Sequence, residues 1–129
     1  DFVDFDLVFG PFATATIAHA TVAEQRYEVA SFIHPRPLSR TERRELLQRV
    51  TTGLAARPGA FLREVGTLSL AGRLTVALTL DLVGGRRGRW RIFFSDPTTL
   101  VELSVGGPVT QHSAESAAAF FARCTIDAP

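Results

Sequence analysis

The 129 residues are enough for one domain with a core that needs neither disulfides nor a metal ion. With 46% hydrophobic and 21% charged residues, the composition excludes a disordered chain. A formal net charge of +1 gives no overall field that would attract nucleic acid or another polyanion. The single cysteine, Cys124, excludes an intrachain disulfide and leaves the redox compartment open.

Three residue types are missing from the composition. The sequence has no Lys, no Asn and no Met, and all 14 basic residues are Arg. Because A/T-rich codons specify the three absent types, we expect a bacterial genome rich in G and C. Since even an initiator Met is lacking, we expect a processed product or an excised domain, from which the native N-terminus, with any signal peptide or anchor, has been removed. No apolar run reaches the ~18 residues of a transmembrane helix, so we predict no membrane span in this chain.

In chain order, strands come first. Phe2 to Phe9 is a candidate N-terminal strand within an extension over 1–10, and a Gly-Pro pair follows it. Residues 12–33 hold two stretches rich in β-branched and aromatic residues, and the polar "AEQ" at 23–25 between them predicts a hairpin. Two prolines in "HPRP" at 34–37 remove ladder donors, so the extended region ends there.

Residues 38–54 predict the first helix. Ser39 and Glu42 have the spacing of a capping box, which satisfies free N–H groups of the first turn. One stripe of the helix is apolar, formed by Leu46, Leu47, Val50 and Leu54. Gly53, or the Pro-Gly pair at 58–59, is expected to end the helix.

Four strands are predicted next, over 61–70, 73–83, 89–95 and 100–105, and a second amphipathic helix begins at the N-cap Ser113. Strands joined by short turns pair antiparallel, and two helices with one apolar stripe each need a sheet to bury against. We therefore predict an α+β fold over 1–129. It is a single domain with an antiparallel sheet, in the order β-β-α-β-β-β-β-α, flanked by two amphipathic helices.

The hairpin "LVGGRRGRWRIFF" at 82–94 is the most conspicuous stretch. A register that places apolar residues on one face pairs Leu82 with Trp90, Leu80 with Ile92 and Leu78 with Phe94, and leaves residues 85–87 as the loop. The same register sets Asp81 opposite Arg91. We expect the Trp90 side of this hairpin to lie in a water-free layer covered by both helices.

Three arginines remain near the tip of that hairpin. Arg86 and Arg87, with Arg89 beside them, fit a solvated hairpin end. The functional alternative is contact with an acidic protein surface or anionic headgroups, which makes these three residues the candidate partner-binding group. A nucleic-acid site would need a wider basic face and exposed aromatics, so we predict no nucleic-acid partner.

No motif predicts catalysis, a cofactor or a metal. His19, His34 and His112 lack the close local spacing of zinc ligands. There is no G-x-S-x-G elbow, and no glycine-rich phosphate loop precedes a helix. Cys124 lies on the apolar stripe of the last helix, where a thiol is usually inert. We therefore predict a protein that is not an enzyme, with no catalytic residue, cofactor or metal site.

Three segments resemble bacterial PsbP-like domains. "REVGTLSLAGRLTVALTLDLVGGRRGRWRIFF" has the strands, glycine turn, polar hairpin and aromatic strand of their middle, and "RYEVASFIHPRP" resembles their second strand with its proline exit. "SAESAAAFFARCTID" is similar to their closing helix, which leads into a short terminal strand. The resemblance covers about Phe12 to Ala128 and implies an α/β/α-like sandwich. A Gly-aromatic-Pro-rich opening is absent, and Cys124 stands where Ser is commoner.

The resemblance also implies a function. PsbP-like domains are typically non-enzymatic; plant members are extrinsic subunits of photosystem II, bacterial members are envelope proteins, often lipoproteins, and others are chaperones for type VI secretion effectors. They share a scaffold and no common site, so no functional residue is carried over. We expect a bacterial binding or accessory module that docks a protein partner, in an extracytoplasmic or secretion-associated setting; a periplasmic or cell-envelope location follows from the resemblance alone.

Two other functions stay open at this point. One is a pocket between the sheet and one helix for a small apolar or anionic ligand, and the other is an unrecognised enzyme of hydrolase type. The identity of the partner and the oligomeric state do not follow from the sequence.

Overall fold

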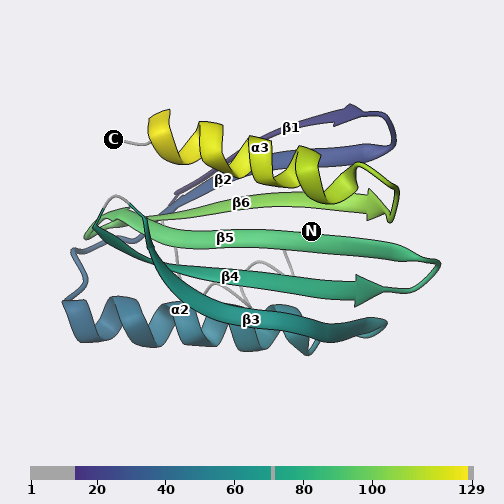
Figure 1. Cartoon of the computed structure of the whole chain (residues 1–129). Helices are drawn as coiled ribbons and strands as arrows, with labels where there is room; N and C mark the ends of the chain where they lie inside the picture. Colours follow the sequence, from purple (N-terminus) through teal and green to yellow (C-terminus); the bar gives the residue numbers. More distant parts are fainter. Residues whose placement is uncertain (1–13, 71, 128–129) are drawn as a thin grey trace.

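A computed structural model describes residues 14–70 and 72–127, so the strand predicted over Phe2 to Phe9 lies outside the described part. In this described part, six strands form one sheet with two helices packed on it (Figure 1). The elements in chain order are β1 (Thr14–Val22), β2 (Gln25–Ile33), α2 (Arg40–Ala55), β3 (Ala60–Leu70), β4 (Arg73–Leu82), β5 (Arg86–Asp96), β6 (Thr99–Pro108) and α3 (Ser113–Asp127). This order confirms the predicted α+β class and its element sequence.

The order of the strands across the sheet is β1-β2-β6-β5-β4-β3, and every neighbouring pair is antiparallel. The last strand therefore pairs with the second and lies in the middle of the sheet. The chain passes through α2 between β2 and β3, and these two strands are far apart in the sheet. As a result β1 and β3 are the two edges, each with one side of its backbone unpaired by the sheet.

The two helices lie on opposite faces of the sheet (Figure 1). α2 covers a larger cluster of buried side chains that includes Leu78, Leu80 and Ile92, whereas α3 covers a smaller one around Phe93 and Phe121. The expectation that both helices cover the Trp90 layer is wrong, because neighbouring residues of a strand point to opposite faces and each face here has its own helix. α3 also continues to Asp127, where the resemblance implied a short strand.

The register of the β4–β5 hairpin differs from the predicted one. Leu78 lies opposite Trp90 and Leu82 opposite Arg86, so the turn is residues 83–85 and Asp81 faces Arg87 instead of Arg91. The shift is an even number of residues, so each side chain keeps its predicted face. Matching apolar faces cannot distinguish registers that differ in this way. The turn determines the register, because the two consecutive glycines at 84 and 85 both adopt positive φ, at 83° and 71°.

The capping box at the start of α2 is confirmed. The Ser39 hydroxyl accepts a hydrogen bond from the Glu42 amide at 3.1 Å, and the Glu42 carboxylate accepts one from the Ser39 amide at 3.0 Å. Each bond satisfies a backbone N–H that has no partner inside the helix. The helix passes through Gly53 and ends at Ala55.

Replacing Ser39 with alanine is expected to lower the free energy of unfolding by about 1 kcal/mol, because the Glu42 amide loses its acceptor. Urea unfolding followed by circular dichroism measures the loss. Thr41→Ala is the matched control, since Thr41 is exposed in the same turn and caps nothing. An equal loss in the two variants would show that the cap contributes nothing specific.

Candidate functional site

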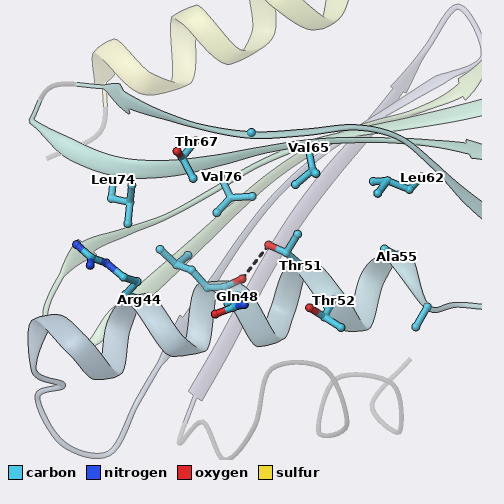
Figure 2. Close-up of a pocket in the computed structure, with 13 residues that line it drawn as sticks. Arg44, Gln48, Thr51, Thr52, Ala55, Leu62, Val65, Thr67, Leu74 and Val76 are labelled. Carbon is cyan, nitrogen blue, oxygen red and sulfur yellow. Dashed lines mark hydrogen bonds between the residues drawn. The ribbon is translucent and has the colours of Figure 1, made fainter.

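An open groove between α2 and the edge strand β3 is the candidate binding site (Figure 2). Its volume is about 740 Å³. The buried stripe of α2 faces β4 and β5, so the adjoining stripe of the helix, with Gln48, Thr52 and Ala55, forms one wall of the groove. Val65 and Thr67 of β3 form the facing wall. Short side chains on the α2 wall leave the space between helix and strand unfilled.

Much of this groove is apolar surface exposed to water. Leu62, Val65 and Leu74, which line it, are 56%, 53% and 41% exposed. Each of these three residues has core residues as neighbours in the sheet. A bulge between Leu62 and Glu64 bends β3 at this point. Single exposed apolar residues are ordinary, but a contiguous apolar surface in a hollow is typical of a binding site.

The groove becomes basic toward the start of α2. A second hollow of about 450 Å³ shares Arg44, Leu47 and Leu74 with the first, and Arg40 and Arg43 also line it. The Arg43 guanidinium donates to the Leu38 carbonyl. Within the described residues, no carboxylate forms an ion pair with Arg40 or Arg44. Arginines in the first turns of a helix lie near the positive end of its dipole, which favours an anion there.

The three arginines predicted as a partner-binding group do not form one surface. Arg86 is exposed at the start of β5 on the face of α2, whereas Arg87 and Arg89 point to the other face. Arg87 Nε donates to Asp81 Oδ1 at 2.8 Å, and its side chain is only 18% exposed. The hydrogen bond from Arg87, with a second from Arg63, lowers the pKa of Asp81. Burial, followed by the nearby charges of Arg87 and Arg63, lowers the pKa of Arg89.

Glu102 is a buried carboxyl that sequence reasoning did not single out. It lies in the middle strand β6 on the α2 side, between Ala30 and Ile92, and is 7% exposed. Burial raises its pKa to about 7, and the nearby Glu28 charge adds to this, while a hydrogen bond from Trp90 acts in the opposite direction. The signal in the sequence for a buried carboxyl was a lone carboxylate within the mostly apolar run of β6.

A row of polar side chains next to Glu102 bears on the enzyme alternative. His19, Glu28 and Ser104 are successive neighbours across β1, β2 and β6. The carboxylate stands between the imidazole and the hydroxyl, whereas a nucleophile needs its base adjacent. These residues line neither hollow beside α2, so the arrangement gives no reason to assign catalysis.

The other histidines are distant from this row in the fold. His34 interacts with the Arg36 backbone, and His112 lies 3.7 Å from Glu115 at the start of α3. Among the residues the structure describes, no three His, Cys, Asp or Glu side chains are placed to hold a metal ion. Cys124 is half-buried and packs against the cluster under α3.

Comparison with known proteins finds similarity to solved structures and to no sequence family. No family model matches the sequence, and no curated protein matches it. The structure of PA94, a protein of unknown function from Pseudomonas aeruginosa described as a candidate regulator, superimposes with a TM-score of 0.54. The two share 13% sequence identity over 85% of this chain and 79% of that chain. At this identity the similarity shows a common fold and nothing about function.

The same comparison leaves the resemblance to PsbP-like domains a prediction.

In the described part of the chain, neither helix has the length and apolar character needed to cross a bilayer.

Proposed function

We propose that this chain is a non-enzymatic binding module that docks a protein partner, and that the partner occupies the groove between α2 and β3. The observation that carries the proposal is this apolar groove, whose walls at Leu62, Val65 and Leu74 are half exposed beside a closed core. A partner that brings apolar side chains into it would remove this surface from water, at about 25 cal/mol for each Å².

The shape of the groove favours a polypeptide over a small ligand. Sites for small molecules bury most of the ligand, whereas this groove stays open along the edge of the sheet. A polypeptide can cover an open groove, because the rest of the partner shields it from solvent.

A small apolar or anionic ligand is the second candidate. Its support is the volume of about 740 Å³, which falls within the range of small-molecule sites, and the adjoining arginines.

The cellular setting of this proposal comes from the sequence. The resemblance of residues 12–128 to PsbP-like domains supports an extracytoplasmic or secretion-associated module. The similarity to PA94 supports the fold and does not bear on this setting.

Filling the groove tests the proposal. We expect Gln48→Trp to reduce partner binding at least tenfold, because Gln48 is exposed in the middle of the groove and an indole there would occupy the space. Arg49→Trp is the matched control. Arg49 follows Gln48 in α2 and is also exposed, but it does not line the groove. The measurement is quantitative mass spectrometry of proteins cross-linked to each variant in cells of the source organism.

Proteins cross-linked to the wild-type chain and to Arg49→Trp, but lost with Gln48→Trp, would support the proposal. An identical protein set for all three chains would contradict it. Native mass spectrometry of the purified chains distinguishes the second candidate: a small molecule that co-purifies with the wild type and is lost with Gln48→Trp would favour a small-ligand site.

A further inference from the structure

We infer that the docked segment binds as an extended strand along the free edge of β3, with a carboxylate directed to Arg40 and Arg44. This inference rests on the proposed function and specifies the chemistry of the partner. It combines three features that meet at one place: an unprotected strand edge, an apolar groove and a basic end.

The edge of β3 has little protection against pairing. Its charged residues, Arg63 and Glu64, are confined to the bulge near its start, and residues 65–70 read VGTLSL, with no charge and no proline. Natural edge strands usually carry charges, prolines or bulges that prevent another strand from pairing. Among the strands that the structure describes, β3 has β4 as its one partner, so its outer N–H and C=O groups face away from that sheet and can bind a strand.

The other edge, β1, does not offer the same combination. β1 is also free of charged Arg, Asp and Glu residues, but it lies at the far side of the sheet from the groove. α2 packs against β3, β4 and β5. A strand added to β3 would therefore gain both main-chain hydrogen bonds and a helix wall for its side chains, whereas a strand added to β1 would gain no wall from α2.

The alternation of a strand then determines which residues of the partner matter. Side chains of β3 at Leu62, Val65 and Thr67 face α2, so every second residue of an added strand would point into the same groove. From Ala55 to Arg44 the α2 wall is about 17 Å long, which is the length of about five extended residues. About three inward side chains therefore fill the groove.

Charge along the groove determines where the acidic residue of that strand lies. The wall beside Thr52 and Ala55 carries no charge, whereas Arg44 and Arg40 follow toward the start of α2. A partner with apolar inward residues at one end and an Asp or Glu at the other complements both parts. A helix could also bring apolar and acidic side chains to the groove, but its backbone bonds are satisfied internally, so it would leave the β3 edge unpaired.

A peptide selection tests this chemistry and does not require the partner to be identified. A phage-displayed library of random 12-residue peptides is panned on the immobilised wild-type chain and depleted on Gln48→Trp. We expect the surviving peptides to carry apolar residues at alternate positions and an acidic residue at one end. Apolar residues spaced three and four apart would indicate a helix and overturn the inference, as would enrichment of basic residues.

Two follow-up measurements use the best selected peptide. N-methylation of alternate backbone amides is expected to weaken binding at least tenfold for one of the two alternating sets, because that set donates to β3. Arg40→Glu combined with Arg44→Glu is expected to weaken binding at least tenfold, with Arg49→Glu as the control. Unchanged affinity for both methylated peptides would overturn the inference that the partner binds as a strand. Unchanged affinity of the double arginine variant would overturn the inference that Arg40 and Arg44 bind a carboxylate.

The outcomes separate this inference from the proposed function. If no peptide distinguishes the wild type from Gln48→Trp, the groove itself is not a polypeptide site and both statements are wrong. If peptides distinguish the two chains but have helical spacing, the groove remains a docking site and only the strand inference is overturned.

Discussion

Replacing Glu102 with glutamine is expected to remove a pH dependence of stability that the wild-type chain shows between about pH 5 and pH 7. Burial raises the pKa of this carboxyl to about 7 in the folded chain, against 4.5 for the unperturbed group. The folded state therefore keeps its proton over a range in which the unfolded state releases it. The stabilising contribution is complete below the unfolded pKa and is lost as the pH rises to the folded pKa.

The expected loss is about 3 kcal/mol across that window, as an order of magnitude. Glutamine is nearly isosteric and its amide oxygen can still accept the hydrogen bond from Trp90, so Glu102→Gln should show a nearly flat profile. Two charged neighbours also affect the pKa of Glu102: Glu28 raises it and Arg57 lowers it. Asp81 and Asp96 have lowered pKa values, so their contributions are lost in more acidic solution, below this window.

Urea unfolding at pH 5 and at pH 8, followed by circular dichroism, measures the effect. Glu28→Gln is the control, because Glu28 is a partly exposed neighbour whose removal should leave most of the slope in place. Parallel pH profiles for the wild type and Glu102→Gln would show that Glu102 titrates normally and that burial does not control its proton.

Local features of the fold could be predicted because short-range physics determines them. Ser39 and Glu42 are three residues apart, and their reciprocal bonds need only the first turn of a helix. Alternation along the strand predicts Ile92 and Phe94 on one apolar face, and both residues are buried. Such features depend on a few neighbours in the chain.

A pocket between the sheet and one helix was one of the sequence-based alternatives, but its position at β3 and the burial of Glu102 could not be predicted, since both depend on which strands meet across the sheet. Glu102 is buried because β6 pairs with β2, whose residue Ala30 is more than 70 positions earlier in the chain. The groove exists because the buried stripe of α2 packs on core residues of β4 and β5, so that the facing side of β3 is left half exposed at Val65 even though the helix also contacts β3. Alternation assigns Val65 to a face but cannot show that β3 is an edge.

The Arg86 hairpin shows the same limit on a smaller scale. Its glycines and arginines are adjacent in sequence, and this suggested one basic tip. Once the turn is placed on the two glycines with positive φ, alternation sends Arg86 and Arg87 to opposite faces, and Arg87 meets Asp81. The shift in register therefore divides these arginines between two faces while it leaves the apolar core unchanged, and their role in partner binding stays a prediction.

Gly88→Ala is expected to destabilise the chain by roughly 1–3 kcal/mol, the range for an overpacked site. A Cβ at Gly88 would lie 2.6 Å from Cζ3 of the Trp90 ring, so the indole would have to move. Gly106 lies directly opposite Gly88 on β6, and a Cβ there would meet nothing closer than 4.0 Å. Gly106→Ala is therefore the matched control and should be neutral or slightly stabilising.

Fluorescence gives a direct second readout, because Trp90 is the only tryptophan in the sequence. Its emission should change with Gly88→Ala and not with Gly106→Ala, and equal spectra would show that the ring does not rest on Gly88. The displaced indole would also lose its hydrogen bond to Glu102, and that bond lowers the pKa of the carboxyl. Gly88→Ala should therefore raise the pKa of Glu102 further and extend the pH-dependent loss of stability to higher pH. The packing of one glycine on β5 is thereby coupled to the proton on a buried acid of the neighbouring strand β6.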